Sequence, residues 1–193
     1  IPGFHDLNWR WQQFQDAMAN GNKERISVAV TEVDFLKSRY DIVEQYDAIK
    51  KDPDFKIRVT HHDTKISNVL LDENEKGICV IDLDTVMPGY FISDLGDMFR
   101  TYLSPANEEE QDLSKIEVRK DYYDAIVKGY LSFMEPELTE KEKAHFHYAG
   151  EFMIYMQALR FLTDFLNDDR YYGQSYEGHN LLRARNQISL LRL

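Results

Sequence analysis

Two short apolar runs on either side of a turn constrain the fold most, because the segments around them have helical spacing. The runs are "NVLLD" and "ICVIDLD", and the "ENEKG" between them carries the Asn and Gly that favour a turn. This order predicts a hairpin, and "KIRVT" just before it predicts another short strand. We therefore expect a small three-strand patch inserted in a helical body.

Apolar residues recur at intervals of three and four over most of the remaining chain. The first helix is expected over 7–20 and one long helix over 23–50, which the "KKDPDFK" turn stops. Thr139 and Glu142 have the spacing of a capping box. Later helical segments are expected over 92–103, 113–133, 139–166 and 176–191.

Composition and charge exclude several classes of protein. The net charge of -11 over 193 residues argues against a broad surface for nucleic acid or anionic membranes. The longest apolar region, 152–162, contains Gln157 and Arg160 and is too short to span a bilayer, so we expect a buried helix. Cys79 is the single cysteine and lies in an apolar run, which predicts a buried thiol and a reducing, cytoplasmic location.

The segment "VTHHDTKISNVLL" (Val59–Leu71) concentrates polar side chains between two predicted strands. It places His61, His62, Asp63, Lys65 and Asn68 within eight residues. A charged loop between apolar strands is costly unless its side chains are used. We therefore interpret it as a candidate functional loop.

The strand after the hairpin turn ends in Asp82 and Asp84, which a strand would place on one side because side chains repeat every two residues. The hairpin would bring both toward Asp63 and Asn68. Crowded carboxylates repel, and a divalent cation with oxygen ligands, such as Mg²⁺, relieves that repulsion. Magnesium, a lysine and a free carboxylate are the components of phosphoryl transfer.

These motifs resemble a known family. "HHDTKISN" has the spacing of the protein-kinase catalytic loop H-R-D-x-K-x-x-N, and "VIDLD" stands where kinases carry the Asp of D-F-G. Without a glycine after "IDLD", the chain is more similar to the kinase-like small-molecule phosphotransferases, which include aminoglycoside, choline and sugar kinases. Within them, "IPGFHDL", "VIDLDTVMPG", "SDLGDMFRT" and "ALRFLTDFLNDDRYY" resemble the N-acetylhexosamine 1-kinases.

The resemblance implies an α+β, mainly α fold, the C-terminal lobe of a protein-kinase-like protein. The lobe would have helices over 1–55, the catalytic loop and metal-binding strands over 56–90, and a helical substrate-binding body over 91–193. Protein kinases also need a nucleotide-anchoring lobe with a glycine-rich loop. The nine glycines are scattered and none forms G-x-G-x-x-G, so we expect that N-terminal lobe to be absent from the chain and the chain alone to be inactive.

The resemblance also implies roles for individual residues. Asp63 would be the catalytic base, Asn68 and Asp82 would hold Mg²⁺ against the phosphates of ATP, and His61 would brace the loop. Lys65 would lie near the transferred phosphoryl group, with a solvated side chain as the alternative. Arg160 and Tyr171 would bind the substrate, an amino sugar.

Several assignments stay open at the level of sequence. Asp84 is either a metal ligand or an acceptor of hydrogen bonds from loop amides, while Asp94 and Asp97 are expected to cap a helix and hold the loop. His5 and Asp6 either reach the site or cap the first helix, and Tyr171 and Tyr172 either stack on a sugar or belong to the core. Asp164, one turn beyond Arg160, is the expected internal partner of that guanidinium.

Alternative functions also stay open. The substrate could be choline or an aminoglycoside, since cationic compounds suit an acidic protein. The chain could be a non-catalytic module that binds a sugar or a protein. A metal phosphohydrolase built on His61, His62, Asp63, Asp82 and Asp84 would need two metal ions, and the spacing of Asn68 argues against it.

Overall fold

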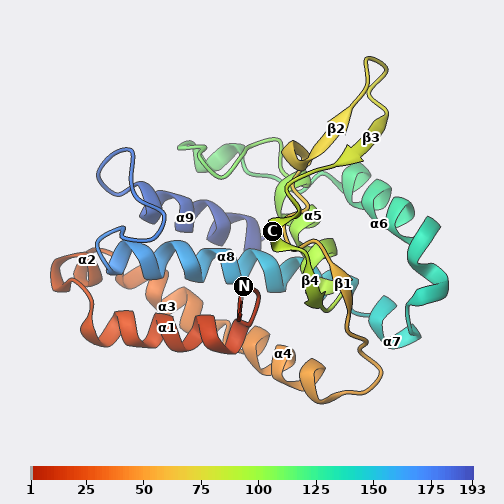
Figure 1. Ribbon diagram of the computed structural model, residues 1–193. Coiled ribbons are helices and arrows are strands. Elements are labelled where there is room, and N and C mark those ends of the chain that lie inside the picture. The colour runs from red at the N-terminus through yellow and green to blue at the C-terminus, as the bar shows by residue number, and fades with distance from the viewer. Residues whose placement is uncertain (1) are drawn as a thin grey trace.

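Helix α8 (Phe146–Leu166) runs through the centre of the molecule, and α1, α4, α5 and α9 pack around it in the computed structural model, which describes residues 2–193 (Figure 1). Seventeen of its 21 residues are buried, so it has no broad polar face. This confirms the buried helix predicted over 152–162. Over residues 2–193, no helix has the length and apolar character needed to cross a membrane.

The N-terminal helices agree with the prediction at first and then depart from it. Helix α1 (Leu7–Asn20) has the predicted bounds, and Asp6 caps it by accepting a hydrogen bond from the Trp9 backbone N–H at 3.2 Å. The single helix predicted over 23–50 is wrong. It is replaced by α2 (Lys23–Val28), α3 (Val30–Ser38) and α4 (Asp41–Lys51).

Burial explains the break between α3 and α4. A straight helix would turn Tyr40 toward the core together with Val33 and Leu36, yet Tyr40 is 40% exposed. The chain instead turns at Arg39, and α4 presents Ile42 and Val43 to the interior. Tertiary packing therefore overrides a sequence period that favours one continuous helix.

The C-terminal helices lie largely where the spacing predicted them. Helix α5 (Ile92–Tyr102) is confirmed, as is the Thr139–Glu142 capping box at the start of α7 (Glu140–Lys143). The segments predicted as single helices over 113–133 and 139–166 are each interrupted. The elements observed there and beyond are a 3₁₀ turn (Leu113–Lys115), α6 (Lys120–Met134), a 3₁₀ turn (Glu135–Glu137), α7, α8 and α9 (His179–Leu191).

The strands form two separate sheets instead of one three-strand patch. Strand β1 (Arg58–Thr60) pairs antiparallel with β4 (Met87–Gly89), and β2 (Val69–Leu71) pairs antiparallel with β3 (Gly77–Val80). The predicted hairpin is confirmed as β2–β3. A 3₁₀ turn (Ile66–Asn68) follows the polar loop and directs β2 away from β1, so the two pairs do not merge.

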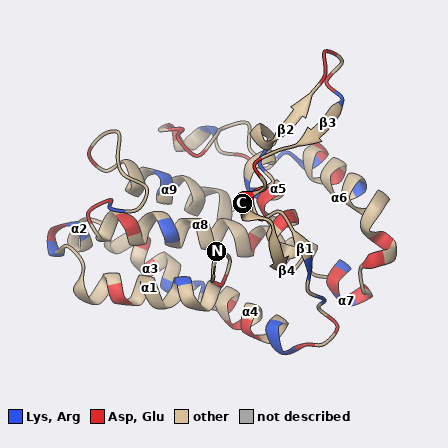
Figure 2. Cartoon of the chain, viewed as in Figure 1, with Lys and Arg blue, Asp and Glu red and all other residues tan. Residues whose placement is uncertain are grey.

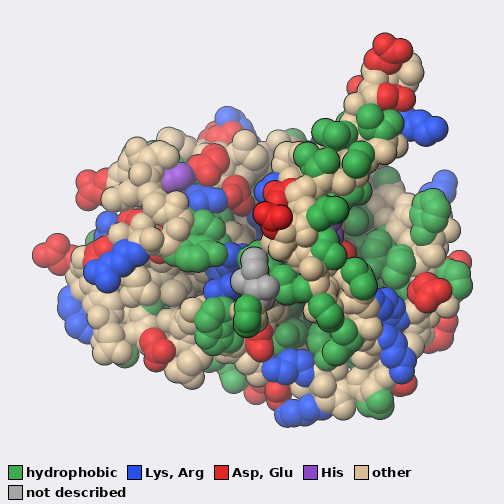
Figure 3. All heavy atoms as spheres, in the orientation of Figure 1, with side chains coloured by type: hydrophobic (Ala, Val, Ile, Leu, Met, Phe, Trp, Pro, Cys, Tyr) green, Lys and Arg blue, Asp and Glu red, His purple; other side chains and the backbone are tan. Residues whose placement is uncertain are grey.

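The β2–β3 hairpin projects from the helical body, and its strands carry no charged residue (Figures 1 and 2). All four residues of β3 are exposed, so the predicted burial of the Cys79 thiol is wrong. Apolar side chains cover this side of the molecule in Figure 3. We use the name exposed apolar face for these side chains of the region: Ile57, Val59, Leu71, Ile78, Val80, Leu83 and Val86, between 40% and 80% exposed.

Candidate active site

The polar loop folds so that Asp63 becomes the centre of a small hydrogen-bonded group. Its Oδ2 accepts from Lys65 Nζ at 2.8 Å and from Asn68 Nδ2 at 2.9 Å. Asn68 is buried, and its Nδ2 also donates to the Asp63 carbonyl oxygen at 2.9 Å. These bonds fix both side chains and leave Asp63 Oδ1 without a hydrogen-bond partner among residues 2–193.

The end of β3 lies beside this group. The backbone N–H of Ile81 donates to the carbonyl oxygen of Asn68 at 2.9 Å, which continues the β2–β3 pairing beyond Val80. Asp82 follows in the left-handed region, with φ of 61°. The hydrogen bond to Asp63 raises the pKa of Lys65, and the charges of Asp82 and Asp97 raise it further. The polar loop and the end of β3 therefore lie side by side, as the sequence predicted for Asp63, Asn68 and Asp82.

Asp82 and Asp84 do not share one side of a strand, which corrects the prediction. Strand β3 ends at Val80, and Asp84 lies in a 3₁₀ turn (Leu83–Thr85). Within residues 2–193, Asp84 accepts no hydrogen bond from a loop amide, so that structural alternative is wrong. Both carboxylates are exposed.

Asn68 and Asp82 offer hard oxygen donors of the kind that Mg²⁺ takes. Nδ2 of Asn68 is used in hydrogen bonds, which leaves Oδ1 available, and the Asp82 carboxylate has no protein partner over residues 2–193. In the same part of the chain, no three His, Cys, Asp or Glu side chains group as metal ligands. The donor set fits an ion that takes its other ligands from phosphates and water, as Mg²⁺ does, and does not fit a two-metal hydrolase.

His61 lies where it can brace the loop. Its Nδ1 accepts from the Asp63 backbone N–H at 3.3 Å, so Nε2 carries the proton and donates to the Ile81 carbonyl oxygen at 3.0 Å. The ring therefore connects the backbone on both sides of the site. The ring of His62 lies elsewhere, within hydrogen-bond distance of Thr60.

Asp94, in the first turn of α5, holds the polar loop in place by hydrogen bonds. Its carboxylate accepts from the backbone N–H groups of His61 at 2.9 Å and His62 at 2.7 Å, and its carbonyl oxygen accepts from Thr64 Oγ1 at 2.8 Å. His62 has a φ of 66°, a conformation these bonds support. The loop-holding role predicted for Asp94 is confirmed, but neither Asp94 nor Asp97 caps the helix, whose N-cap is Phe91.

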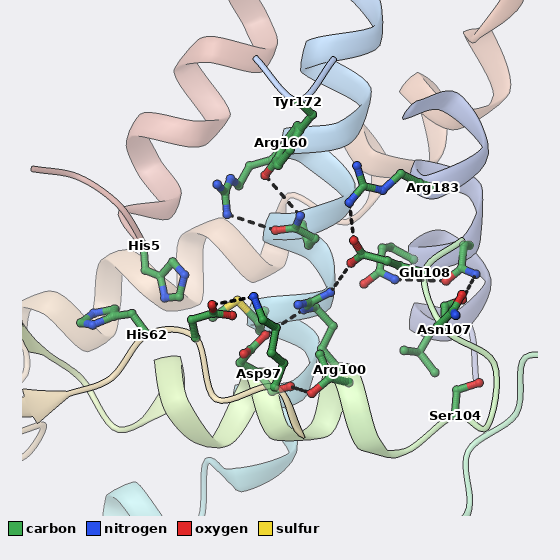
Figure 4. Close-up of a pocket in the computed structure, with 18 of the residues that line it drawn as sticks. His5, His62, Asp97, Arg100, Ser104, Asn107, Glu108, Arg160, Tyr172 and Arg183 are labelled. Carbon is green, nitrogen blue, oxygen red and sulfur yellow. Dashed lines mark hydrogen bonds and ion pairs between the residues drawn. The ribbon is translucent and has the colours of Figure 1, made fainter. Parts of the chain in front are cut away.

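A cavity of about 500 Å³ opens beside Asp63, between α5, α8, α9 and the chain segments before α1 and after α5 (Figure 4). Its wall mixes polar and apolar side chains and carries charges of both signs. Four cations and three carboxylates line it: Lys65, Arg100, Arg160 and Arg183, with Asp63, Asp97 and Glu108. The cavity is therefore not acidic, although the whole chain is.

Arg160 points into this cavity, but its partners differ from the prediction. Its Nη1 donates to Gln157 Oε1 at 3.1 Å, and its guanidinium carbon lies 5.2 Å and 5.4 Å from the ring centroids of Phe4 and Tyr172. Asp164 is not its partner. That carboxylate accepts from the backbone N–H groups of Tyr171 and Tyr172, both at 2.8 Å, and so shapes the turn after α8.

The two tyrosines occupy different positions. Tyr171 lines the cavity but is 69% exposed, so the core alternative is wrong for it. The hydroxyl of Tyr172 accepts a hydrogen bond from Gln157 Nε2 at 3.2 Å. His5 also lines the cavity, where burial, and then the positive fields of His62 and Arg160, hold its pKa well below the usual range, so its ring is neutral at pH 7.

Sequence reasoning missed a row of alternating charges across the cavity wall. Arg100 Nε donates to Asp97 Oδ1 at 2.9 Å and Arg100 Nη1 donates to Glu108 at 2.8 Å, while Glu108 also accepts from Arg183 (Figure 4). The guanidinium carbon of Arg183 lies 3.8 Å from the ring centroid of Phe161. These residues come from α5, α9 and the loop between α5 and α6, so no local motif joins them.

The family model of the phosphotransferase enzyme family (APH) matches this chain over residues 3–131. The match covers more than half of the chain and includes Asp63, Asn68, Asp82 and the Asp97–Arg100 pair. Arg160 and Tyr171 lie beyond it. The chain therefore belongs to the phosphotransferase enzyme family, whose relatives include kinases of the aminoglycoside and choline type.

Proposed function

We propose that this chain is the catalytic lobe of an ATP- and Mg²⁺-dependent small-molecule kinase that phosphorylates a hydroxyl group of an amino sugar, an N-acetylhexosamine. One observation carries the proposal. The Asp63 carboxylate is held by Lys65 and Asn68 beside the cavity, and over residues 2–193 one of its oxygens has no hydrogen-bond partner. Membership of a phosphotransferase family supports the reaction class, since kinases of this family use ATP and typically Mg²⁺.

The free oxygen of Asp63 suits a general base. Oδ1 would accept the proton of the acceptor hydroxyl, whose oxygen forms a bond to the γ-phosphorus as the bond to the β-phosphate oxygen breaks and ADP leaves. Lys65 lies where its ammonium would stabilise charge on the transferred group. Asn68 and Asp82 would hold Mg²⁺, which neutralises charge on the phosphates when bound.

The exposed apolar face suits contact with a nucleotide-anchoring lobe. An isolated two-stranded hairpin is marginally stable, and contiguous exposed apolar patches mark interaction surfaces. The face includes Ile78 at 63% and Leu83 at 60% exposure, close in sequence to Asp82. A lobe packed there would bring a bound nucleotide next to the candidate metal ligands.

Charge in the cavity favours a neutral sugar as the acceptor. Four Lys or Arg side chains face three Asp or Glu side chains, so a polycationic aminoglycoside would meet net positive charge. Choline binds best against aromatic faces, but the rings of Phe4 and Tyr172 already contact the guanidinium of Arg160. The alternating donors and acceptors of the wall suit hydroxyl and acetamido groups.

The substrate assignment is tested by phosphoryl transfer from ATP in the protein carrying its nucleotide-anchoring lobe. N-acetylglucosamine, choline and an aminoglycoside are compared as acceptors for the wild type and Arg160→Lys. We expect transfer to the sugar, and about a tenfold higher KM in Arg160→Lys at an unchanged melting temperature, because lysine cannot make a forked contact. Preferred transfer to choline or the aminoglycoside refutes the sugar assignment, and transfer to no acceptor favours a non-catalytic binding module.

A further inference from the structure

Asp97 lies on the wall of the cavity, and only one of its two buried carboxylate oxygens accepts a hydrogen bond from the described residues. The residue is 3% exposed and lines the cavity together with Asp63 and Lys65 (Figure 4). Its Oδ1 accepts from Arg100 Nε at 2.9 Å, but its buried Oδ2 has no hydrogen-bond partner over residues 2–193. The backbone N–H of Thr64 points toward this carboxylate but lies outside hydrogen-bond geometry to Oδ2.

An unpaired buried carboxylate oxygen is costly, so its partner is expected to come from the cavity. The missing partner need not be a cation. Arg100 already balances the charge of Asp97, and the row continues through Glu108 to Arg183. What Oδ2 lacks is a hydrogen-bond donor, and a neutral hydroxyl group supplies one without adding charge.

A second acceptor in the same cavity has the same need. Gln187, on α9, is 2% exposed, and its Nε2 donates to Asn186 Oδ1 at 3.1 Å. Its Oε1 is buried and has no partner in the described chain, and the residue lines the cavity with Asp97. Two unpaired acceptors in one cavity suit a ligand that carries several hydroxyl donors.

We propose that Asp97 is a specificity-determining residue whose Oδ2 accepts a hydrogen bond from one hydroxyl group of a neutral sugar bound in the cavity. The inference deepens the proposed function, because that sugar is the phosphoryl acceptor, and Asp97 touches it at a hydroxyl other than the one beside Asp63. The contact selects for a hydroxyl donor at one ring position. It would reject an analogue that can only accept a hydrogen bond there.

Deoxyfluoro sugars test this contact, because C–F can accept a hydrogen bond but cannot donate one. The chain of 193 residues and its Asp97→Asn variant are titrated by NMR with N-acetylglucosamine, glucose, galactose and their monofluoro analogues. For the wild type, fluorination at the ring position that contacts Asp97 should weaken binding about 10- to 100-fold, and this is the position whose loss Asp97→Asn should relieve. In Asp97→Asn the new amide N–H can donate to fluorine, and the same analogue should bind within about threefold of its parent.

Glu142→Gln is the matched control, since Glu142 is a buried carboxylate in contact with Arg58, away from the cavity. It should lower stability and leave the fluorine discrimination of the wild type unchanged. A different result would separate the two proposals. If Asp97→Asn removes the fluorine discrimination of the wild type for glucose or galactose, but N-acetylglucosamine does not bind, the role of Asp97 is retained and the amino-sugar assignment is refuted.

Three results would overturn the inference. The first is equal weakening of every sugar in Asp97→Asn together with a lower melting temperature, which indicates a role in packing alone. The second is an unchanged affinity of the wild type for every fluorinated analogue, as expected if Oδ2 bonds only water or Thr64. The third is failure of all neutral sugars to bind, including the case in which choline or an aminoglycoside binds instead.

Discussion

Asp94 holds the candidate catalytic loop through two charge-assisted hydrogen bonds, and removing them should destabilise both the fold and the site. A hydrogen bond to a charged group contributes about 1.5–3 kcal/mol, and the Asp94 carboxylate accepts two, from the backbone N–H groups of His61 and His62. Because Asp94 is half-buried, hydrogen bonds to water can replace part of this stabilisation in the variant. We therefore expect Asp94→Ala to lower the free energy of unfolding by about 3 kcal/mol, the lower end of the sum.

Denaturant unfolding measures the stability of the variant, and hydrogen exchange measures protection of the two amides. Asp94→Asn keeps one acceptor oxygen and should lose about half as much free energy. Asp124→Ala is the control, because its exposed carboxylate forms a surface ion pair with Lys120 one turn away and the substitution should change stability by less than about 0.5 kcal/mol. A loss for Asp94→Ala no larger than this control, with unchanged exchange at His61 and His62, would refute the reasoning.

Two further predictions concern stability. Burial acts to raise the pKa of the Glu142 carboxyl, but the Arg58 guanidinium and backbone donors outweigh it and hold that pKa below its ordinary 4.5. The stabilisation is therefore fully present above that ordinary value of 4.5 and is lost as pH falls through the folded pKa. In denaturant titrations, Glu142→Gln should cost stability at pH 7 and progressively less below about pH 4. An equal cost at pH 7 and at about pH 3 would contradict this. An added Cβ at Gly96 would lie 2.1 Å from the Ala149 carbonyl oxygen, so Gly96→Ala should separate α5 from α8 and lower the free energy of unfolding by more than about 2 kcal/mol. Gly129→Ala, with open space around the new methyl group, should instead raise it by about 0.5–1 kcal/mol, and similar values for the two variants would contradict the packing described.

Local signals in the sequence were sufficient where one element carries its own chemistry. The capping box of Thr139 and Glu142, the hairpin and the helix that begins at Ile92 each follow from signals in adjacent residues. The loop motif is equally local, because Lys65 and Asn68 both donate to the Asp63 carboxylate within the same short loop. The geometry beside Asp63 could therefore be anticipated.

Features that depend on distant segments could not be anticipated in this way. Strand β4 contains Pro88 and Gly89, which are poor strand formers, and it pairs only because β1 lies beside it. Cys79 lies in an apolar run that would be buried in a covered strand, but the hairpin projects. Asp97 and Arg183 meet through Arg100 and Glu108, a convergence of helices that no sequence spacing encodes.

The most direct test of the account is the turnover of Asp63→Asn in the proposed two-lobe kinase, in which this chain is joined to a nucleotide-anchoring lobe. The amide keeps an oxygen that can accept from Lys65 and Asn68, but it cannot take a proton from the acceptor hydroxyl. We predict that kcat for phosphoryl transfer to N-acetylglucosamine falls by about 10²–10⁴-fold, the range for loss of a general base, while the affinity for Mg-ATP is unchanged. A kcat within about threefold of the wild type would contradict the role of Asp63 and, with it, the proposed function.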